Sequence, residues 1–591
     1  MTDLSPAAIR VLQARYLRRD ADGRVVETPE ALFHRVARAV AQAELLLGGA
    51  READRWQEAF HGALRALDFL PNSPALMNAG TPVGQLGACF VLPVEDTLES
   101  IFDALKSMAL LQRTGGGTGF AFSRLRPRGD VLASSGGEAS GPVSFMRVFD
   151  AATQHIKLGG RRRGANMGVL RVDHPDILEF IDAKLDPASL CNFNLSVGVT
   201  DAFMEAVSAA SAFDLVHPVQ RRPARRLGAR AVFDRMVDRA WRTGDPGVVF
   251  LDTINRANPT PSLGDIEATN PCGEVPLLPW ESCILGSVNL ANMVTGAHGS
   301  TGIHWDRLRH AVEVGVRFLD DAIEVNRDPL PQIAAATRGN RKIGLGVMGF
   351  AECLLRLGVA YDSEDALAWA DQIAAFVADV ARGASRQLAR ERGAFPNWSR
   401  SVHAVAGDRI RNATLLSIAP TGTLSIIAGT TAGIEPMFAL AYRREHTLDG
   451  APLVEVNPVF LRDLEERGLD RRPLIEAILT SGTARTAPGL PEEARRLFVT
   501  ATEVSVHGHL RIQAAFQRHV DNAVSKTINL PEDADQDAVA EAFREGWRLG
   551  LKGVTVYRSG TKAGQVITLG VGDDAMAREL FVKCDPGACR V

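Results

Sequence analysis

No run of about 18 or more apolar residues occurs in the sequence, which argues against a membrane-spanning helix. The first residues, Met1 to Pro6, lack the basic region and apolar core of a secretory signal peptide. Cysteine is scarce: seven residues, an odd number spread over 591 positions, do not form the disulfide framework of a small secreted protein. The net charge of −4 gives no reason to expect nucleic-acid binding. We therefore expect a cytoplasmic protein that contacts neither membrane nor nucleic acid.

The sequence does contain enough apolar material for a large core, since 46% of its residues are hydrophobic. Residues 7–70 are rich in Ala, Leu and Arg and predict helices, one of which begins at Pro29 after Thr28. Strands are predicted at 88–92, 343–347 and 414–419, and long amphipathic helices at 306–325 and 364–392. Strands that alternate with helices favour an α/β architecture.

The stretch from Asn270 to Glu274 carries the residue types of a reactive site. Pro271 removes a backbone donor and Gly273 permits a turn, so we expect a short extended loop rather than a helix. Residues two apart in an extended segment point the same way, which would place Asn270, Cys272 and Glu274 on one face. An amide, a thiol and a carboxylate would then lie side by side. The alternative is that Cys272 packs as a small buried hydrophobe.

Three glycine-containing loops stand out in the sequence. A helix predicted from near Asp96, with Glu99 as its capping-box partner, ends at Gly115–Gly117. The loop Gly115–Gly119 could cradle a phosphate, but it lacks the Lys-Ser/Thr ending of a P-loop and follows a helix rather than a strand, so we favour a helix stop with a flexible turn. Gly159–Gly164 is a flexible cationic loop, or else a solvated basic turn. Pro420–Leu424 follows a predicted strand and suits phosphate binding at a helix N-terminus, although a plain strand-to-helix turn would look the same.

The last thirty or so residues lose periodicity and end with Cys584 and Cys589 on a Gly/Pro turn. Two thiols so placed can form a reversible disulfide. Two cysteines without a second pair cannot close a tetrahedral zinc site, so we favour redox chemistry over metal binding.

Five motifs occur in order: residues 72–80, 192–196, 270–274, 281–287 and 419–423. Together they resemble the large catalytic chain of ribonucleotide reductase, most closely the adenosylcobalamin-dependent class II enzymes. The resemblance runs from about Leu4 to about Ser559, and the tail is similar to the cysteine tails of related reductases.

The resemblance implies a fold: a ten-stranded α/β barrel of two five-stranded halves with a central finger loop. The chain would divide into a helical N-terminal region (1–70), the catalytic barrel (71–560) and a flexible redox tail (561–591).

It also implies catalytic roles. Cys272 would be the thiyl radical that abstracts the 3′ hydrogen, Glu274 the base for the 3′ hydroxyl, and Asn270 a hydrogen-bonding partner. Cys89 and Cys283 would supply the reducing electrons and end as a disulfide. Cys584 and Cys589 would re-reduce that disulfide by exchange. Cys191 and Cys353 match no catalytic position, and we assign both to packing.

Binding residues follow from the same resemblance. Those expected to contact the substrate are Ser73, Ala88, Gly117, Pro420, Thr421, Gly422, Thr423 and Leu424. Those expected to bind a specificity effector, or to relay its identity, are Asp96, Thr97, Leu98, Arg126, Arg161, Arg162 and Arg163.

Tyrosine scarcity bears on the radical source. Class I chains receive their radical through an adjacent tyrosine pair, but the four tyrosines here, Tyr16, Tyr361, Tyr442 and Tyr557, are all separated. The glycyl-radical segment and four-cysteine zinc site of class III enzymes are not visible either. Adenosylcobalamin is therefore the expected cofactor, with no metal ligand from the protein.

The expected substrate is a ribonucleotide, as the diphosphate, and the expected partners are deoxynucleotide or ATP effectors, a thioredoxin- or glutaredoxin-like reductant, and a second copy of the chain. Two alternatives stay open: a class I-type chain that uses a separate radical-generating subunit, and a non-catalytic nucleotide-binding regulator with the same fold. The regulator is disfavoured because a degenerate chain should have lost some of the reactive residues.

Overall fold

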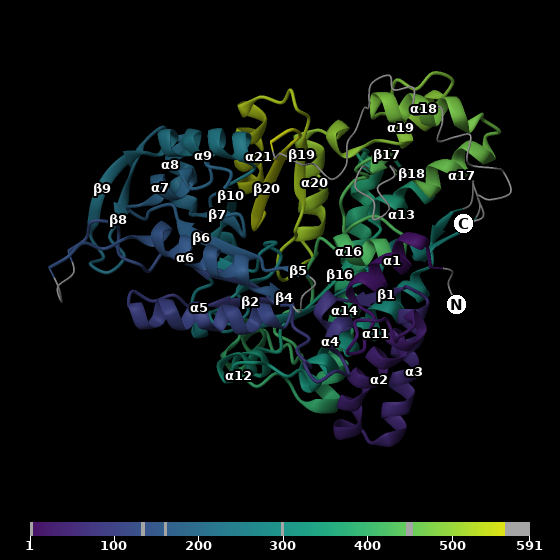
Figure 1. The fold of residues 1–591 in the computed structure, drawn as a ribbon, viewed down its shortest axis with the longest axis horizontal. Coiled ribbons are helices and arrows are strands. Elements are labelled where there is room, and N and C mark those ends of the chain that lie inside the picture. Colours follow the sequence, from purple (N-terminus) through teal and green to yellow (C-terminus); the bar gives the residue numbers. More distant parts are fainter. Residues whose placement is uncertain (1–3, 132–135, 159–161, 297–300, 445–452, 562–591) are drawn as a thin grey trace.

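The computed structural model describes residues 4–131, 136–158, 162–296, 301–444 and 453–561 (Figure 1). Within these ranges no helix is both long and apolar enough to cross a membrane.

Three helices form the N-terminal region: α1 (Pro6–Arg15), α2 (Pro29–Leu47) and α3 (Ala50–Arg65). Thr28 caps α2 by accepting a hydrogen bond from the backbone N–H of Ala31, and Pro29 occupies the first helical position, as predicted. α2 and α3 pack against α11 (Trp305–Val325), and α11 packs against α14 (Glu364–Arg392), so the N-terminal helices share one core with the second half of the chain.

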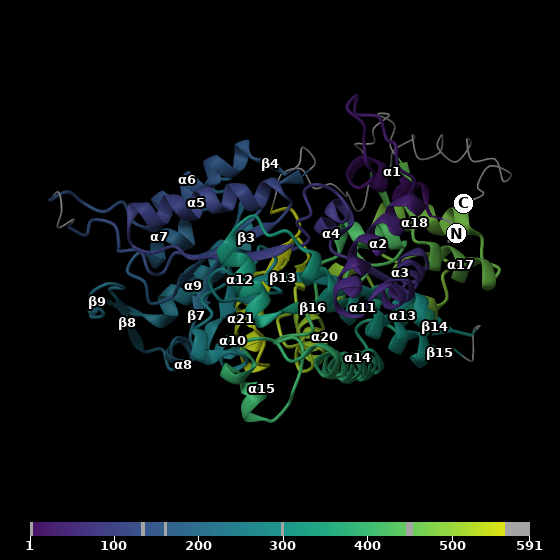
Figure 2. The ribbon, with the colours of Figure 1, turned by 90° about the horizontal axis from the view of Figure 1, so that it is seen from below.

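The first half of the barrel consists of five parallel strands. In spatial order they are β2 (Cys89–Leu92), β3 (Gly117–Ala121), β6 (Asn166–Arg171), β7 (Phe193–Val199) and β10 (Gly247–Phe250). Helices cover their outer face, as Figure 2 shows: α5 (Leu98–Arg113), α6 (Pro142–His155), α7 (Ile177–Asp182), α8 (Asp201–Ser208) and α9 (Ala229–Thr243).

The second half is likewise parallel. Its members in spatial order are β20 (Gly553–Arg558), β19 (Thr527–Leu530), the extended segment 414–418, β16 (Ile343–Met348) and β13 (Ser282–Asn289). The segment 414–418 lies between β16 and the residues that lead into β19, and it makes only isolated bridges to each. The two halves meet antiparallel at β10 with β20 and at β2 with β13. The expected ten-stranded barrel of two five-stranded halves is confirmed.

The start of α5 differs from the prediction. Thr97, not Asp96, is the N-cap, and its side chain accepts a hydrogen bond from the backbone N–H of Ser100. The Asp96 carboxylate instead accepts hydrogen bonds from the backbone and the guanidinium of Arg126. The capping box with Glu99 was therefore wrong, because Asp96 has a charged partner that is distant in sequence.

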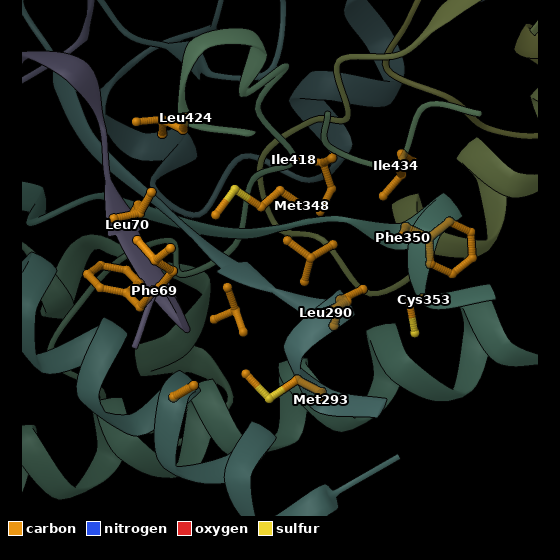
Figure 3. Packing of buried hydrophobic residues seen from close by; sticks show 14 of the residues in the cluster. Phe69, Leu70, Leu290, Met293, Met348, Phe350, Cys353, Ile418, Leu424 and Ile434 are labelled. Carbon is orange, nitrogen blue, oxygen red and sulfur yellow. The ribbon is translucent and has the colours of Figure 1, made fainter. Parts of the chain in front are cut away.

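The main core surrounds β1 (Phe69–Pro71), which pairs with β13, and α13 (Phe350–Arg356) (Figure 3). Cys353 lies in this core with no exposed surface, and burial raises the pKa of its thiol to about 12, so it is a packing residue as expected. Cys191 is exposed, and its thiol donates to the carbonyl of Pro187 at 3.2 Å. The assignment of Cys191 to packing was wrong, because it lies in an exposed turn.

Candidate active site

A short hairpin enters the barrel and carries the reactive stretch. Its arms are β11 (Ala268–Thr269) and β12 (Pro276–Leu277), and apolar residues of both arms pack inside the barrel with β2, β6 and β13. Gly119 on β3 lets the hairpin approach this closely, since a Cβ there would lie 1.7 Å from the carbonyl oxygen of Thr269. A larger residue at position 119 would displace the hairpin.

The tip of the hairpin is a turn rather than the extended loop that we predicted. The N–H of Gly273 donates to the carbonyl of Asn270 at 3.1 Å, and Gly273 has a φ of 83°, which favours glycine. Asn270 and Glu274 are each 2% exposed, whereas Cys272 is exposed. All three side chains nevertheless line one cavity of about 230 Å³. The turn therefore brings the amide, thiol and carboxylate together by a different geometry.

Asn270 connects the hairpin tip to the cysteine pair. Its side-chain N–H donates to the Sγ of Cys89 at 3.0 Å, and its side-chain oxygen accepts from the backbone N–H of Val275 at 3.0 Å. Both ends of the amide are thus occupied, which fixes Asn270 relative to β2.

Cys89 and Cys283 lie directly opposite each other where the two halves of the barrel meet, at the antiparallel pairing of β2 with β13. Directly opposed residues in such a pair have Cβ atoms about 4.5–5.5 Å apart, and a disulfide needs about 3.5–4.5 Å, so a small shift suffices to join the sulfurs. Burial raises the pKa of both thiols, with Glu274 adding to the effect. The pair is therefore held as two protonated thiols, each able to give up a proton and an electron.

Glu274 is set up as an acid–base group. Burial raises its pKa from 4.5 to about 7, against the opposing effect of a hydrogen bond with Asn270. Its Oε2 has no hydrogen-bond partner among the described residues. Its backbone carbonyl accepts from the Ser417 hydroxyl and from the N–H of Ala523, both at 2.9 Å. The carboxyl is thus anchored through its backbone and retains an oxygen for a substrate proton.

The cavity also collects the residues expected to contact a substrate. Its lining includes Ser73, Ala88, Gly117, Pro420, Thr421, Gly422, Thr423 and Leu424. The Pro420 loop leads into α16 (Gly422–Ala428), whose first backbone N–H groups have no partner within the helix. Thr421 has a φ of 51°, and its hydroxyl accepts from the N–H of Gly433 at 2.8 Å. This contact holds the loop in its uncommon conformation.

A second, larger cavity of about 410 Å³ lies against the same hairpin tip, and Cys272 lines both cavities. Its wall includes parts of β7, β10 and β20 and the polar side chains of Asn194, Ser196, Lys526 and Thr555. Asn194 also donates to the carbonyl of Pro271 at 2.8 Å, which ties the tip to β7. Cys272 therefore borders both cavities.

The remaining predicted residues lie elsewhere. Asp96, Thr97, Leu98 and Arg126 gather at the start of α5 and line neither cavity. Arg162 and Arg163 form β5 (Arg162–Arg163), which pairs with β4 (Lys157–Leu158). Arg161, Cys584 and Cys589 lie outside the described residues.

Sequence reasoning missed several contributors to the site. Asn72 lines the smaller cavity, where its side-chain Nδ2 is buried without a partner among the described residues, while its oxygen caps α4 (Ser73–Asn78). Its place in the motif 72–80 was the available signal. Tyr16, which directly follows α1, contacts Ser73, and no local pattern indicates this contact.

Comparisons with known proteins agree with this geometry. Residues 2–84 match the family model described as "Ribonucleotide reductase, all-alpha domain", and residues 87–409 and 397–557 match "Ribonucleotide reductase, barrel domain". A vitamin B12-dependent ribonucleoside-diphosphate reductase of Mycobacterium tuberculosis is 54% identical over 96% of this chain and 81% of its own length. The enzyme of that name from Thermoplasma acidophilum is 44% identical over 97% and 81%.

The fold has a solved counterpart in the class Id ribonucleotide reductase alpha subunit of Actinobacillus ureae. The two structures superpose with a TM-score of 0.76 at 25% sequence identity, over 94% of this chain and 97% of that one.

Proposed function

The chain belongs to the ribonucleotide reductase family, and from that premise we propose that it reduces ribonucleoside diphosphates to 2′-deoxyribonucleotides with adenosylcobalamin as its cofactor. The observation that carries the proposal is the meeting of Asn270, Cys272 and Glu274 in one cavity, with Asn270 bonded to a cysteine that faces another cysteine.

Cys272 starts and ends the reaction. Adenosylcobalamin, when bound, supplies the one-electron chemistry that takes the hydrogen atom from the Cys272 thiol. The resulting sulfur radical removes the hydrogen atom from C3′ of the ribose, and Glu274 accepts the proton of the 3′ hydroxyl. At the end Cys272 returns its hydrogen atom to C3′ and regains the radical.

The cysteine pair supplies the reduction between these steps. A thiol of Cys89 or Cys283 protonates the 2′ hydroxyl, which leaves as water. The two sulfurs then form a disulfide, and their two electrons and remaining proton replace the lost hydroxyl by hydrogen. The sum is one ribonucleotide and two thiols converted to one deoxyribonucleotide, one disulfide and one water.

The larger cavity fits the cofactor by its position and chemistry. Like the smaller cavity it is lined by Cys272, and its polar lining offers hydrogen-bonding groups for a nucleoside and for amide side chains. Asn194, Ser196 and Thr555 would hold the group there.

Partners follow from the same premise. A thioredoxin- or glutaredoxin-like protein would restore the Cys89–Cys283 thiols through Cys584 and Cys589 by disulfide exchange. Deoxynucleotide or ATP effectors would bind near Asp96 and Arg126.

A second copy of the chain would pack on α5 and α6, which lie together and expose Leu98, Phe102 and Val148, at 60%, 51% and 39%. Exposed apolar side chains on neighbouring helices are suited to an interface between copies.

The test compares cysteine variants of the purified chain with a ribonucleoside diphosphate, adenosylcobalamin and a small dithiol. Cys272→Ser is expected to form no deoxynucleotide. Cys191→Ser is the matched control, because Cys191 is exposed and lines neither cavity, and it should keep wild-type activity. Activity in Cys272→Ser, or equal loss in both variants, would contradict the proposal.

A further inference from the structure

The smaller cavity lacks a positive charge. None of the described residues that line it is a lysine or an arginine, and its one carboxyl group belongs to Glu274. A nucleoside diphosphate carries several negative charges, and backbone N–H groups at the start of α16 neutralise them only in part. A cation from outside the lining would therefore strengthen phosphate binding at the Pro420–Leu424 loop.

α1 delivers such a cation. The Nη1 of Arg15 donates to the Oγ1 of Thr423 at 3.2 Å, although 408 residues separate the two. α1 packs against α16, and the two helices lie side by side in Figure 1. The guanidinium of Arg15 is therefore one hydrogen bond away from the loop that is proposed to bind phosphate.

The next residue, Tyr16, contacts a second residue of the cavity lining. The hydroxyl of Tyr16 lies 2.8 Å from the hydroxyl of Ser73, which lines the cavity and begins α4. Arg15 and Tyr16 thus connect the end of α1 to two residues that line the cavity, Thr423 and Ser73.

The position of α1 is fixed by its own sequence. Ser5 caps the helix by accepting from the N–H of Ala8, and Pro6 is its first residue. Leu12 and Tyr16 are 0% and 2% exposed and belong to the main core. This burial anchors the backbone that carries Arg15. The guanidinium is already held near Thr423, so little conformational entropy is lost when the substrate binds.

We propose that Arg15 is a substrate-positioning residue that binds the terminal phosphate of the diphosphate, and that Tyr16 orients Ser73 in the lining of the same cavity. The inference rests on the proposed function and deepens it. It assigns a role at the catalytic cavity to an N-terminal helix that precedes the barrel. Arginine suits this role because its planar fork presents two parallel donors to phosphate oxygens.

The experiment measures steady-state kinetics with a ribonucleoside diphosphate and inhibition by inorganic pyrophosphate. In Arg15→Gln, KM and the inhibition constant of pyrophosphate are expected to rise together by about 10- to 100-fold, the range of a charge-assisted hydrogen bond, with kcat within about twofold. Arg15→Lys, which keeps the charge, should fall between wild type and Arg15→Gln. Tyr16→Phe should raise KM by less than Arg15→Gln.

Arg10→Gln is the matched control, because Arg10 is an exposed arginine of the same helix and should leave both constants unchanged. Unchanged constants in Arg15→Gln, or a fall in kcat with KM constant, would overturn the inference, since a purely structural role would not move pyrophosphate inhibition. Should Arg15→Gln fail to fold, Arg15→Lys decides in the same way. An inactive wild type would instead count against the proposed function.

Discussion

Burial of Glu274 makes the stability of this protein depend on pH in a way that one substitution should remove. Its pKa is raised from 4.5 to about 7 because the carboxyl is enclosed beside the hairpin tip. At about 1.4 kcal/mol per pH unit, that rise corresponds to about 3 kcal/mol of folding free energy. The Glu274→Gln variant keeps the size and shape of the side chain but cannot ionise.

The direction of the pH dependence follows from the protonation of Glu274 in the folded and the unfolded chain. Below a pH of about 4.5 the carboxyl is protonated whether the chain is folded or not. Between about 4.5 and 7 the unfolded chain ionises while the folded chain keeps its proton, so the folded state loses stability as pH rises through this window. The Glu274→Gln variant has no such loss. Its free energy of unfolding, relative to that of wild type, should therefore grow by about 2–3 kcal/mol between about pH 5 and pH 8.

The assay is urea unfolding of both proteins, side by side at several pH values, together with the rate of ribonucleotide reduction. Glu274→Gln should be the more stable protein above pH 7 and yet lose about 100-fold or more in rate, since it cannot accept the 3′ hydroxyl proton. Glu58→Gln, a change at an exposed glutamate, should alter neither quantity. A stability difference that stays flat across this pH range would refute the raised pKa.

Three further changes test other parts of the site. Without external reductant, wild type should lose two thiols after one turnover, as measured by thiol titration. Cys283→Ser should lose none. Gly119→Ala should destabilise the protein by about 1–3 kcal/mol or more and lower its activity, because the added Cβ would meet the Thr269 carbonyl. Gly383→Ala, with open space around it, should be tolerated. Thermal melting and activity assays of both variants measure these effects. Cys584→Ser should keep activity with a small dithiol and lose it with thioredoxin, and wild-type activity with thioredoxin would contradict the shuttle.

The regular elements were predictable where the apolar pattern is long. The helix predicted at 364–392 spans Glu364–Arg392 in the structure, because a 29-residue amphipathic pattern leaves little room for another interpretation. The strand predicted at 414–419 is less regular, since 414–418 makes only isolated bridges. Hydrogen bonding between distant segments decides that outcome, and no local pattern reports it.

The reactive residues were predictable in kind but not in geometry. The motif 270–274 indicated an amide, a thiol and a carboxylate on one site, and the structure places all three in one cavity. The extended conformation was wrong because Gly273 adopts a positive φ and closes a turn. The role proposed for Arg15 could not be predicted from the sequence, because its contact with Thr423 exists only once α1 packs on α16.

The most direct test of the account is an assay of the purified single chain with a ribonucleoside diphosphate and a dithiol, with and without adenosylcobalamin. We predict deoxynucleotide in the presence of the cofactor and none in its absence, because no two of the four tyrosines are adjacent to relay a radical from another subunit. Product without adenosylcobalamin, or no product with it, would contradict the assignment of Cys272 as a thiol activated by that cofactor.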